Sequence, residues 1–295
     1  MPIIKVFDQT AGASNQGYAA AAAMAVTLAK ATEPEPANVG PRKRVKAERT
    51  RPRNPNRLTI DQHVFPLKSI KRFVGQSGRV SVRLLTRDKV IQARPNGAVF
   101  CASRAWDHRA ETGYMKRIED DFQRVVDPIV EGRSSVVLEE DKHSIDRMYA
   151  LWYMRARYRE LEAQEIQLNG ITGSHLTLEQ EENLERNGYI FTRERGTMPA
   201  RQLNGVVLQM RMDWYAHHLS THVQRWGVIV AQSGEFVVPD VPWHQIMPLT
   251  PRLALVHSSL DGMITEQNLA QINAAMTALS RDYFFARDFA NCPLL

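Results

Sequence analysis

The stretch IDRMYALWYMRARYRELEAQEI, residues 145–166, decides the fold class because it carries a strong helical pattern. Its apolar side chains recur every three or four residues, which is the spacing of one face of an α-helix. Several arginine and glutamate side chains occupy the other, solvent-facing side. The pattern predicts an amphipathic helix over residues 145–166 with its core side formed by Ile145, Met148, Tyr149, Trp152, Leu161 and Ile166.

Other helical patterns lie before and after this stretch. Their apolar residues keep the same spacing. Asn187-Gly188 is a typical stop signal at the end of one helix, and Thr265 is a suitable N-cap at the start of another. Helices are expected over Met115–Val130, Leu178–Arg186, Leu203–Val223 and Thr265–Leu279.

Short apolar and β-branched runs lie on both sides of this helical block. The turn signal at residues 75–78 predicts a hairpin between Val64–Val74 and Arg79–Leu85. Ser233-Gly234 predicts a second hairpin between Trp226–Ala231 and Phe236–Val238. Further short strands are expected at Ile3–Phe7, Val99–Cys101, Leu253–His257 and Tyr283–Ala286. This order predicts an α+β fold, in which a central helical block is flanked by short antiparallel strands and hairpins.

The positive charge of the chain is concentrated in one segment. The chain has a net charge of +6. Residues 42–57, here called the basic segment, hold eight cationic side chains against Glu48, a balance of +7, so the remaining residues sum to −1. The surrounding sequence is rich in proline and poor in large apolar residues, which is typical of a disordered linker. We therefore expect an N-terminal strand and helix segment (1–32), a disordered basic linker (33–57) and a main domain (58–295).

The composition bears on the cellular compartment. Cys101 and Cys292 are too few and too far apart for a disulfide framework, so both are expected to be reduced, buried thiols of a cytoplasmic protein. No apolar run is long enough to cross a membrane. The alanine-rich run Gly17–Ala31 offers two interpretations, a packed helix or a secretory signal, and its poor positive start favours the helix.

Several short motifs recur in order between Leu58 and Asp288. The first is QHVFP at residues 62–66, followed by KRF at 71–73. The later ones are WGVIV at 226–230, EFVVPDVP at 235–242, MPLTPRLAL at 247–255, EQN at 266–268 and RDYFF at 281–285. In this order the motifs resemble a bacterial family of unknown function, DUF 4238. The family pattern Ser-Asp-Asn-Pro is Pro239-Asp240-Val241-Pro242 here, so the asparagine of that motif is missing. The family implies no settled activity.

Three residues are candidate catalytic groups. His63 has a free pKa near neutrality, as a general base requires, and Asp240 follows a predicted strand. The resemblance adds Asn268, at the start of the last helix. Each has a structural alternative: His63 as a satisfied polar group, and Asp240 as a turn residue that accepts backbone N–H groups. If His63 and Asp240 converge in a concave pocket, they form a candidate site.

His218 and His222 are spaced like two metal ligands on a helix, beside His217. The glutamate of the zinc-protease motif is absent, because Leu219 follows His218. A polar face near a helix end explains the cluster as well, and we expect neither a metal nor another cofactor.

Two functions of different classes remain open. The first is a nucleic-acid-associated hydrolase, of nuclease or toxin type, with His63 and Asp240 in its site. The basic segment would bind phosphates through Arg42, Lys43, Arg44, Lys46, Arg49, Arg51 and Arg53. The second is a non-enzymatic binding or regulatory module, whose apolar groove engages an unknown protein partner while the basic segment is only a tether.

Overall fold

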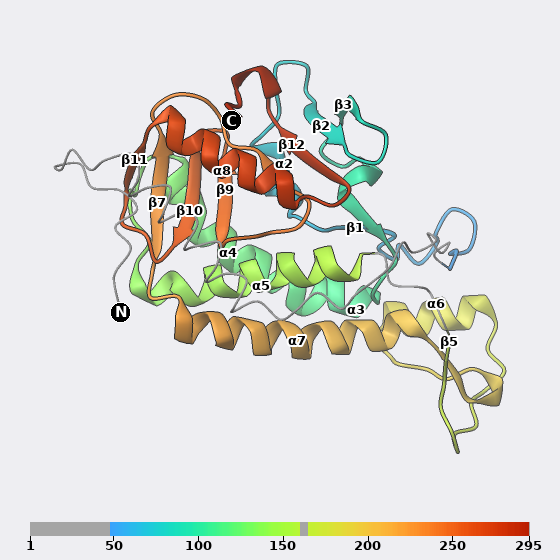
Figure 1. Ribbon diagram of the computed structural model, residues 1–295. Coiled ribbons are helices and arrows are strands. Elements are labelled where there is room, and N and C mark those ends of the chain that lie inside the picture. Colours follow the sequence, from blue (N-terminus) through green and yellow to red (C-terminus); the bar gives the residue numbers. More distant parts are fainter. Residues whose placement is uncertain (1–47, 160–164, 295) are drawn as a thin grey trace.

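In the computed structural model, which describes residues 48–159 and 165–294, the helices of the central block lie side by side below two small sheets (Figure 1). This arrangement confirms the α+β fold with antiparallel sheets around a helical block. The helices are α2 (Leu67–Lys71), α3 (His108–Ala110), α4 (Lys116–Val130), α5 (Lys142–Tyr158), α6 (Leu178–Arg186), α7 (Ala200–His222) and α8 (Glu266–Leu279). A π-helical turn, η2 (Glu111–Met115), joins α3 to α4. Single 3₁₀ turns are η1 (Ala98–Phe100), η3 (Glu139–Asp141), η4 (Glu194–Gly196) and η5 (Phe289–Asn291).

The strands form two four-stranded sheets and two short pairs. The first sheet has the order β11-β7-β10-β9, and the second has the order β3-β2-β12-β8. All neighbours are antiparallel except β11 and β7. The short pairs are β1 with β4 and β5 with β6. The strands are β1 (Asp61–His63), β2 (Val80–Leu84), β3 (Lys89–Ala93), β4 (Cys101–Ser103), β5 (Glu165–Gln167), β6 (Thr197–Pro199), β7 (Trp226–Ala231), β8 (Val238–Pro239), β9 (Ile246–Thr250), β10 (Leu253–His257), β11 (Gly262–Ile264) and β12 (Tyr283–Ala286).

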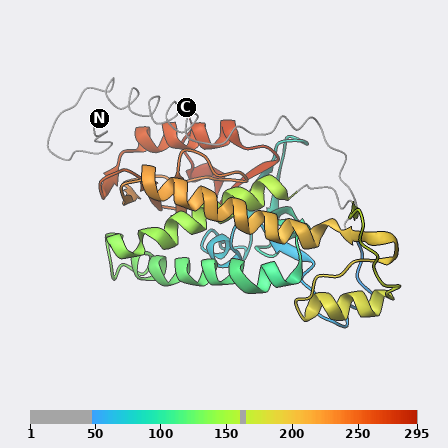
Figure 2. The same cartoon turned by 90° about the horizontal axis from the view of Figure 1, so that it is seen from below.

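Helix α5 is the centre of the helical layer, and α4 and α7 pack against it (Figure 2). Its aromatic side chains join the main core, where Trp152 contacts Phe65 at 4.5 Å between ring centroids and Tyr149 contacts Trp226 at 5.8 Å. Helix α8 covers the first sheet and buries Leu269 against it. A segment from β5 to β6, residues 165–199 and here called the arm, extends beyond the end of the helical layer and carries α6 (Figure 1).

Local sequence signals explain most of these elements. Strands β7, β10 and β12 have the expected bounds. Helix α6 also has them, and its capping box consists of Thr177 and Gln180. The Thr265 hydroxyl accepts a hydrogen bond from the Asn268 N–H and caps α8, as expected. Both cysteines are free and buried, also as expected.

Four predictions of secondary structure are wrong. The strand expected at Val99–Cys101 is instead the 3₁₀ turn η1 over Ala98–Phe100, and β4 begins only at Cys101. The helix over residues 145–166 ends at Tyr158, and Ile166 lies in strand β5, paired with Met198. Helix α5 also has no broad solvent-facing side, because its neighbours cover it on several faces and Arg155 is fully buried.

The two predicted hairpins have different partners. Residues 67–71 form helix α2, and β2 instead pairs with the following strand, β3. Strand β7 pairs with β10 and β11, whereas the segment after Gly234 crosses to the second sheet, where Val238 pairs with Phe285. Both strands thereby belong to four-stranded sheets, whereas an isolated two-stranded hairpin is only marginally stable in water.

Within residues 48–159 and 165–294, no helix is both long enough and apolar enough to cross a lipid bilayer.

Candidate functional site

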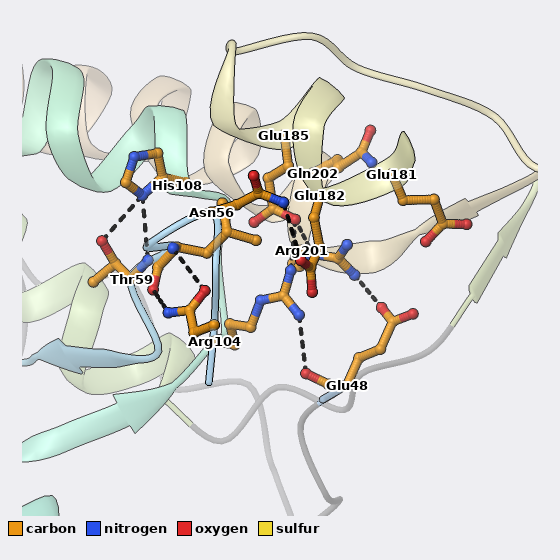
Figure 3. Close-up of polar contacts among 12 residues, drawn as sticks. Glu48, Asn56, Thr59, Arg104, His108, Glu181, Glu182, Glu185, Arg201 and Gln202 are labelled. Carbon is orange, nitrogen blue, oxygen red and sulfur yellow. Dashed lines mark hydrogen bonds and ion pairs between the residues drawn. The ribbon is translucent and has the colours of Figure 1, made fainter. Parts of the chain in front are cut away.

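The described end of the basic segment does not extend freely into solvent. Residues 48–57 lie against α6, which differs from the disorder expected for residues 33–57 (Figure 3). The Arg51 N–H donates to Glu182 at 2.6 Å, and its guanidinium pairs with Glu182 at 3.2 Å and Glu179 at 3.0 Å. Arg51, one of the predicted phosphate-binding residues, is therefore neutralised by the protein itself. Arg49 and Arg53 are exposed, and Arg42, Lys43, Arg44 and Lys46 lie outside the described residues.

Glu48, the one acidic residue of the basic segment, anchors it to a buried cluster of charges. Its carboxylate pairs with Arg193 of the arm and Arg201 of α7. Arg201 also donates to Glu185 at 2.9 Å, and Glu185 accepts a second hydrogen bond from Arg104 at 2.6 Å (Figure 3). The opposite charges of this cluster are paired, although Nε of Arg104 has no hydrogen-bond partner among the described residues, and the cluster is an anchor that joins the basic segment, the arm and α7.

Asp240 is a structural residue. It is 2% exposed, and its two carboxylate oxygens accept the backbone N–H groups of Arg281 at 2.9 Å and Asp282 at 2.8 Å. Burial raises the pKa of Asp240, although these two hydrogen bonds oppose the shift. The side chain thus fastens the corner after β8 to the start of β12, as a turn-forming aspartate does.

Asn268 lies in the first turn of α8 and is half-buried, and its backbone N–H completes the cap of this helix. A different asparagine of the same helix is the buried one. The Asn273 side chain accepts from the Val237 N–H at 3.0 Å and donates to the Glu235 carbonyl at 2.9 Å. Asn273 therefore joins α8 to the segment before β8.

His63 feels the charges of an ion-paired group that sequence reasoning missed. Arg155 of α5 is fully buried, and its guanidinium pairs with Glu119 of α4 and, at 3.3 Å, with Glu111 of η2. Both carboxylates are partly exposed, with 17% of the Glu111 side chain and 21% of the Glu119 side chain accessible. These two glutamates, Arg155 and His63 are here called the α5 site.

The hydrogen bond of His63 assigns its ring nitrogens. Nε2 lies 3.3 Å from the Pro95 carbonyl oxygen, which can only accept, so Nε2 carries the proton and Nδ1 keeps a lone pair. Burial lowers the pKa of His63 below its ordinary 6.5, while the charges of Glu119 and Glu111 act in the opposite direction. At neutral pH the imidazole is therefore uncharged, and its protonated form has two carboxylates nearby to stabilise it.

The backbone around the α5 site is arranged to hold Glu111. The π-helical turn η2 begins at this residue and contains Gly113, whose φ of −95° and ψ of −106° are not helical. Single π-helical turns occur frequently at functional sites. The Trp106 indole N–H donates to Glu111 at 2.6 Å, and Gln62, the residue before His63, holds Trp106 by accepting its backbone N–H at 3.2 Å.

The charges of different arginines act on His63 and Asp240. Arg155 lies in α5, and Arg159 is the C-cap residue directly after this helix. The charge of Arg155 acts on His63, and that of Arg159 acts on Asp240. Within the described part of the chain, no hydrogen bond or ion pair joins His63 to Asp240. The pair of His63 and Asp240 predicted from the sequence therefore does not form. The carboxylates whose charges act on His63 are those of Glu111 and Glu119.

Sequence reasoning missed Arg155 because arginines were assigned to the solvent side of its helix. One signal could have found it. Arg155 follows Met148 by seven residues and Trp152 by three, which places it on their apolar face. A charged side chain at such a position needs buried partners of opposite charge.

The histidines at the end of α7 interact with each other. The rings of His218 and His222 are 4.0 Å apart between centroids, and Trp214 stacks on His218 at 5.9 Å. No group of three or more histidine, cysteine, aspartate or glutamate side chains in residues 48–159 and 165–294 is arranged to hold a metal ion.

Comparisons of the chain with protein-family models, with curated proteins and with solved structures find no match. The resemblance to DUF 4238 therefore stays a prediction.

Proposed function

We propose that the protein is a nucleic-acid-associated hydrolase of nuclease type, with the α5 site as its active site. The observations that carry this proposal are the lone pair on Nδ1 of His63 and the charges of Glu111 and Glu119, which act on this imidazole while a buried arginine holds both carboxylates. A neutral histidine whose protonated form is stabilised by nearby carboxylates has the properties of a general base.

In the proposed reaction His63 first accepts one proton and then donates it. Nδ1 takes a proton from a water molecule as the water oxygen forms a bond to phosphorus. The bond from phosphorus to the leaving oxygen breaks, and the imidazolium returns the proton to that oxygen. Glu111 and Glu119 stabilise the imidazolium between the two transfers, and Arg155 is a positioning residue that orients both carboxylates.

The substrate class follows from the basic segment. Arg49, Arg53 and Arg57 are exposed, and this segment leads directly into β1, which carries His63. His63 is six positions after Arg57, so their Cα atoms are at most about 20 Å apart. A polyanion that binds these cations would therefore lie near the α5 site. Part of the +7 net charge of the basic segment is not available to a polyanion, because Arg51 is paired with Glu179 and Glu182 of α6.

The decisive experiment measures cleavage of labelled single-stranded RNA and double-stranded DNA by the full chain. His63→Gln is expected to slow cleavage at least about 100-fold, the lower range for loss of a general base, without a large change in melting temperature. His143→Gln, at an exposed position of α5, is the matched control and should cleave normally. If neither nucleic acid is cleaved, or if His63→Gln cleaves at the normal rate, the proposal is wrong.

A second observation favours the non-enzymatic alternative. Helix α7 exposes an apolar stripe on its outer face, where Met210 is 68% and Trp214 is 58% exposed, in line with the partly exposed Leu203. Residues 203, 210 and 214 follow the seven-residue spacing of helices that pair with another helix. This alternative predicts that a photoreactive residue at position 210 crosslinks to a partner protein. Trp214→Glu should remove the crosslink, and His63→Gln should leave it unchanged.

A further inference from the structure

A second concentration of positive charge lies in the strands that follow the basic segment. Residues 62–100 hold eight cationic side chains and one acidic side chain, a balance of +7, whereas residues 101–295 hold 20 cationic and 26 acidic side chains, a balance of −6. These opposite values nearly cancel, so the net charge of the main domain conceals the separation. The eight cations are Lys68, Lys71, Arg72, Arg79, Arg83, Arg87, Lys89 and Arg94.

Only three of these cations are paired within the described part of the chain. The pairs are Lys68 and Arg72 with Asp127, and Arg83 with Asp88. Four of the unpaired cations belong to residues 79–94, which comprise β2, β3 and their flanking residues and are here called the basic hairpin. Three of the four side chains are exposed and the first is partly exposed: Arg79, Arg87, Lys89 and Arg94. Their charges are therefore available to an anion from solution.

The register of the basic hairpin brings two of these cations to opposite positions. Val80 is opposite Ala93 in the ladder of β2 and β3, so Arg79 and Arg94 are the next opposing residues. The Arg79 guanidinium donates to the Gln92 carbonyl at 3.3 Å, which holds it against β3. Like charges at directly opposite positions destabilise a pair of strands. An anion bound between Arg79 and Arg94 removes this repulsion.

Protection of a sheet edge explains only one of the four cations. Strand β3 is the outer strand of the second sheet, and a charged side chain on such a strand prevents its pairing with another chain (Figure 1). Lys89 occupies a position of this strand, whereas Arg87 lies in the turn between β2 and β3. Arg79 and Arg94 lie beyond the last pair of the ladder. Three cations therefore need another explanation.

The open end of the basic hairpin adjoins the α5 site. Arg94 directly precedes Pro95, whose carbonyl accepts the hydrogen bond from Nε2 of His63 at 3.3 Å. The hairpin contains no aromatic side chain on which a base could stack, so the group that its cations fit is phosphate. Its tip, Thr86-Arg87-Asp88, is polar and carries no apolar residue to insert into a lipid bilayer.

We propose that the basic hairpin is a docking surface for the phosphate backbone of a nucleic acid, which it holds beside the α5 site. The choice of polyanion rests on the proposed function, but the contacts belong to residues 79–94 and to none of the basic segment. Binding through phosphates alone is independent of the base sequence and weakens steeply as salt is added.

The test is the binding of fluorescently labelled double-stranded DNA and single-stranded RNA, followed by anisotropy between about 50 and 200 mM salt. The full chain carries His63→Gln, so that cleavage does not consume the probe. The added changes Arg87→Gln, Lys89→Gln and Arg94→Gln should together weaken binding of at least one probe about tenfold or more. The slope of log affinity against log salt should fall by about one for each cation. Arg94→Gln alone should lower it by about one, which keeps the test valid if the combined variant does not fold.

The control removes the same charge from exposed positions elsewhere, through Arg124→Gln, Arg133→Gln and Arg225→Gln, and should bind like the parent chain. Equal losses in the control and the hairpin variant, or unchanged binding in the hairpin variant, would each overturn the proposal. Binding to vesicles of anionic lipid but to neither nucleic acid would overturn it as well. Binding that depends on the hairpin in a wild-type chain that cleaves nothing would refute the chemistry assigned to His63 and support the docking surface.

Discussion

Asp240→Asn separates a catalytic role from a structural role for this buried carboxylate. In the folded protein the two oxygens of Asp240 accept one backbone N–H each, from Arg281 and Asp282. The asparagine has nearly the same shape, but only one of its two terminal atoms is an acceptor. The other terminal group is an amide NH₂, which would face a backbone N–H.

The cost follows from these two contacts. A hydrogen bond to a charged group contributes about 1.5–3 kcal/mol, and a buried donor left unsatisfied costs about 1–3 kcal/mol. Burial raises the pKa of Asp240, which means that the buried charge is itself unfavourable, and the neutral amide recovers part of this cost. The balance is a loss of about 2–3 kcal/mol. In a chain of this size, such a loss lowers the melting temperature by about 4–12 °C.

Urea denaturation and calorimetry measure this loss, with Asp121→Asn as the control at an exposed position of α4. Any catalytic activity of the variant should be retained below its melting temperature, because no reacting group has changed. The structural assignment would be refuted by a variant that melts with the wild-type protein, and even more clearly by one that melts normally but has lost all activity.

The other predictions concern buried charges elsewhere in the fold. Arg155→Met leaves two carboxylates without their shared cation, and urea denaturation should show a loss of about 3–5 kcal/mol in the free energy of unfolding. Changing Glu111 and Glu119 to glutamine as well should restore part of this stability. If the triple variant is no more stable than Arg155→Met, the pairing is contradicted. Burial, reinforced by the charge of His244, lowers the pKa of His257 from 6.5 to about 4. The unfolded chain therefore binds the proton first as the pH falls, and up to about 3 kcal/mol of stability should be lost between pH 6.5 and 4. His257→Asn should flatten this part of the pH–stability curve, and an unchanged curve would disprove the assignment. Arg51→Met should speed hydrogen exchange in residues 48–59, because the segment loses its ion pairs with Glu179 and Glu182, whereas unchanged exchange would show that Arg51 does not anchor the segment.

The local elements of this protein could be predicted from its sequence with useful accuracy. Strands β7, β10 and β12 and helix α6 have the predicted bounds, because β-branched runs, turn residues and a capping box act over only a few positions. The α+β class and the burial of both cysteines follow from the same kind of local pattern and composition.

Strand partners were not predictable in the same way. The turn at Ser233-Gly234 could close a hairpin, but the chain instead crosses to a second sheet, where Val238 pairs with Phe285 from a distant part of the sequence. Which pairing forms depends on the apolar surface that each strand buries, and this surface exists only when distant segments have packed together.

The candidate site, too, was predicted from the sequence only in part. The sequence was sufficient to single out His63, because a histidine with a pKa near neutrality is recognisable as a residue type. Only the tertiary structure brought the charges of Glu111, Glu119 and Arg155 to act on His63. It also hydrogen-bonded both oxygens of Asp240 to backbone amides and paired Arg51 with α6. Electrostatic and hydrogen-bonding partners depend on distances of a few ångströms between residues far apart in the chain, and no local pattern encodes those distances.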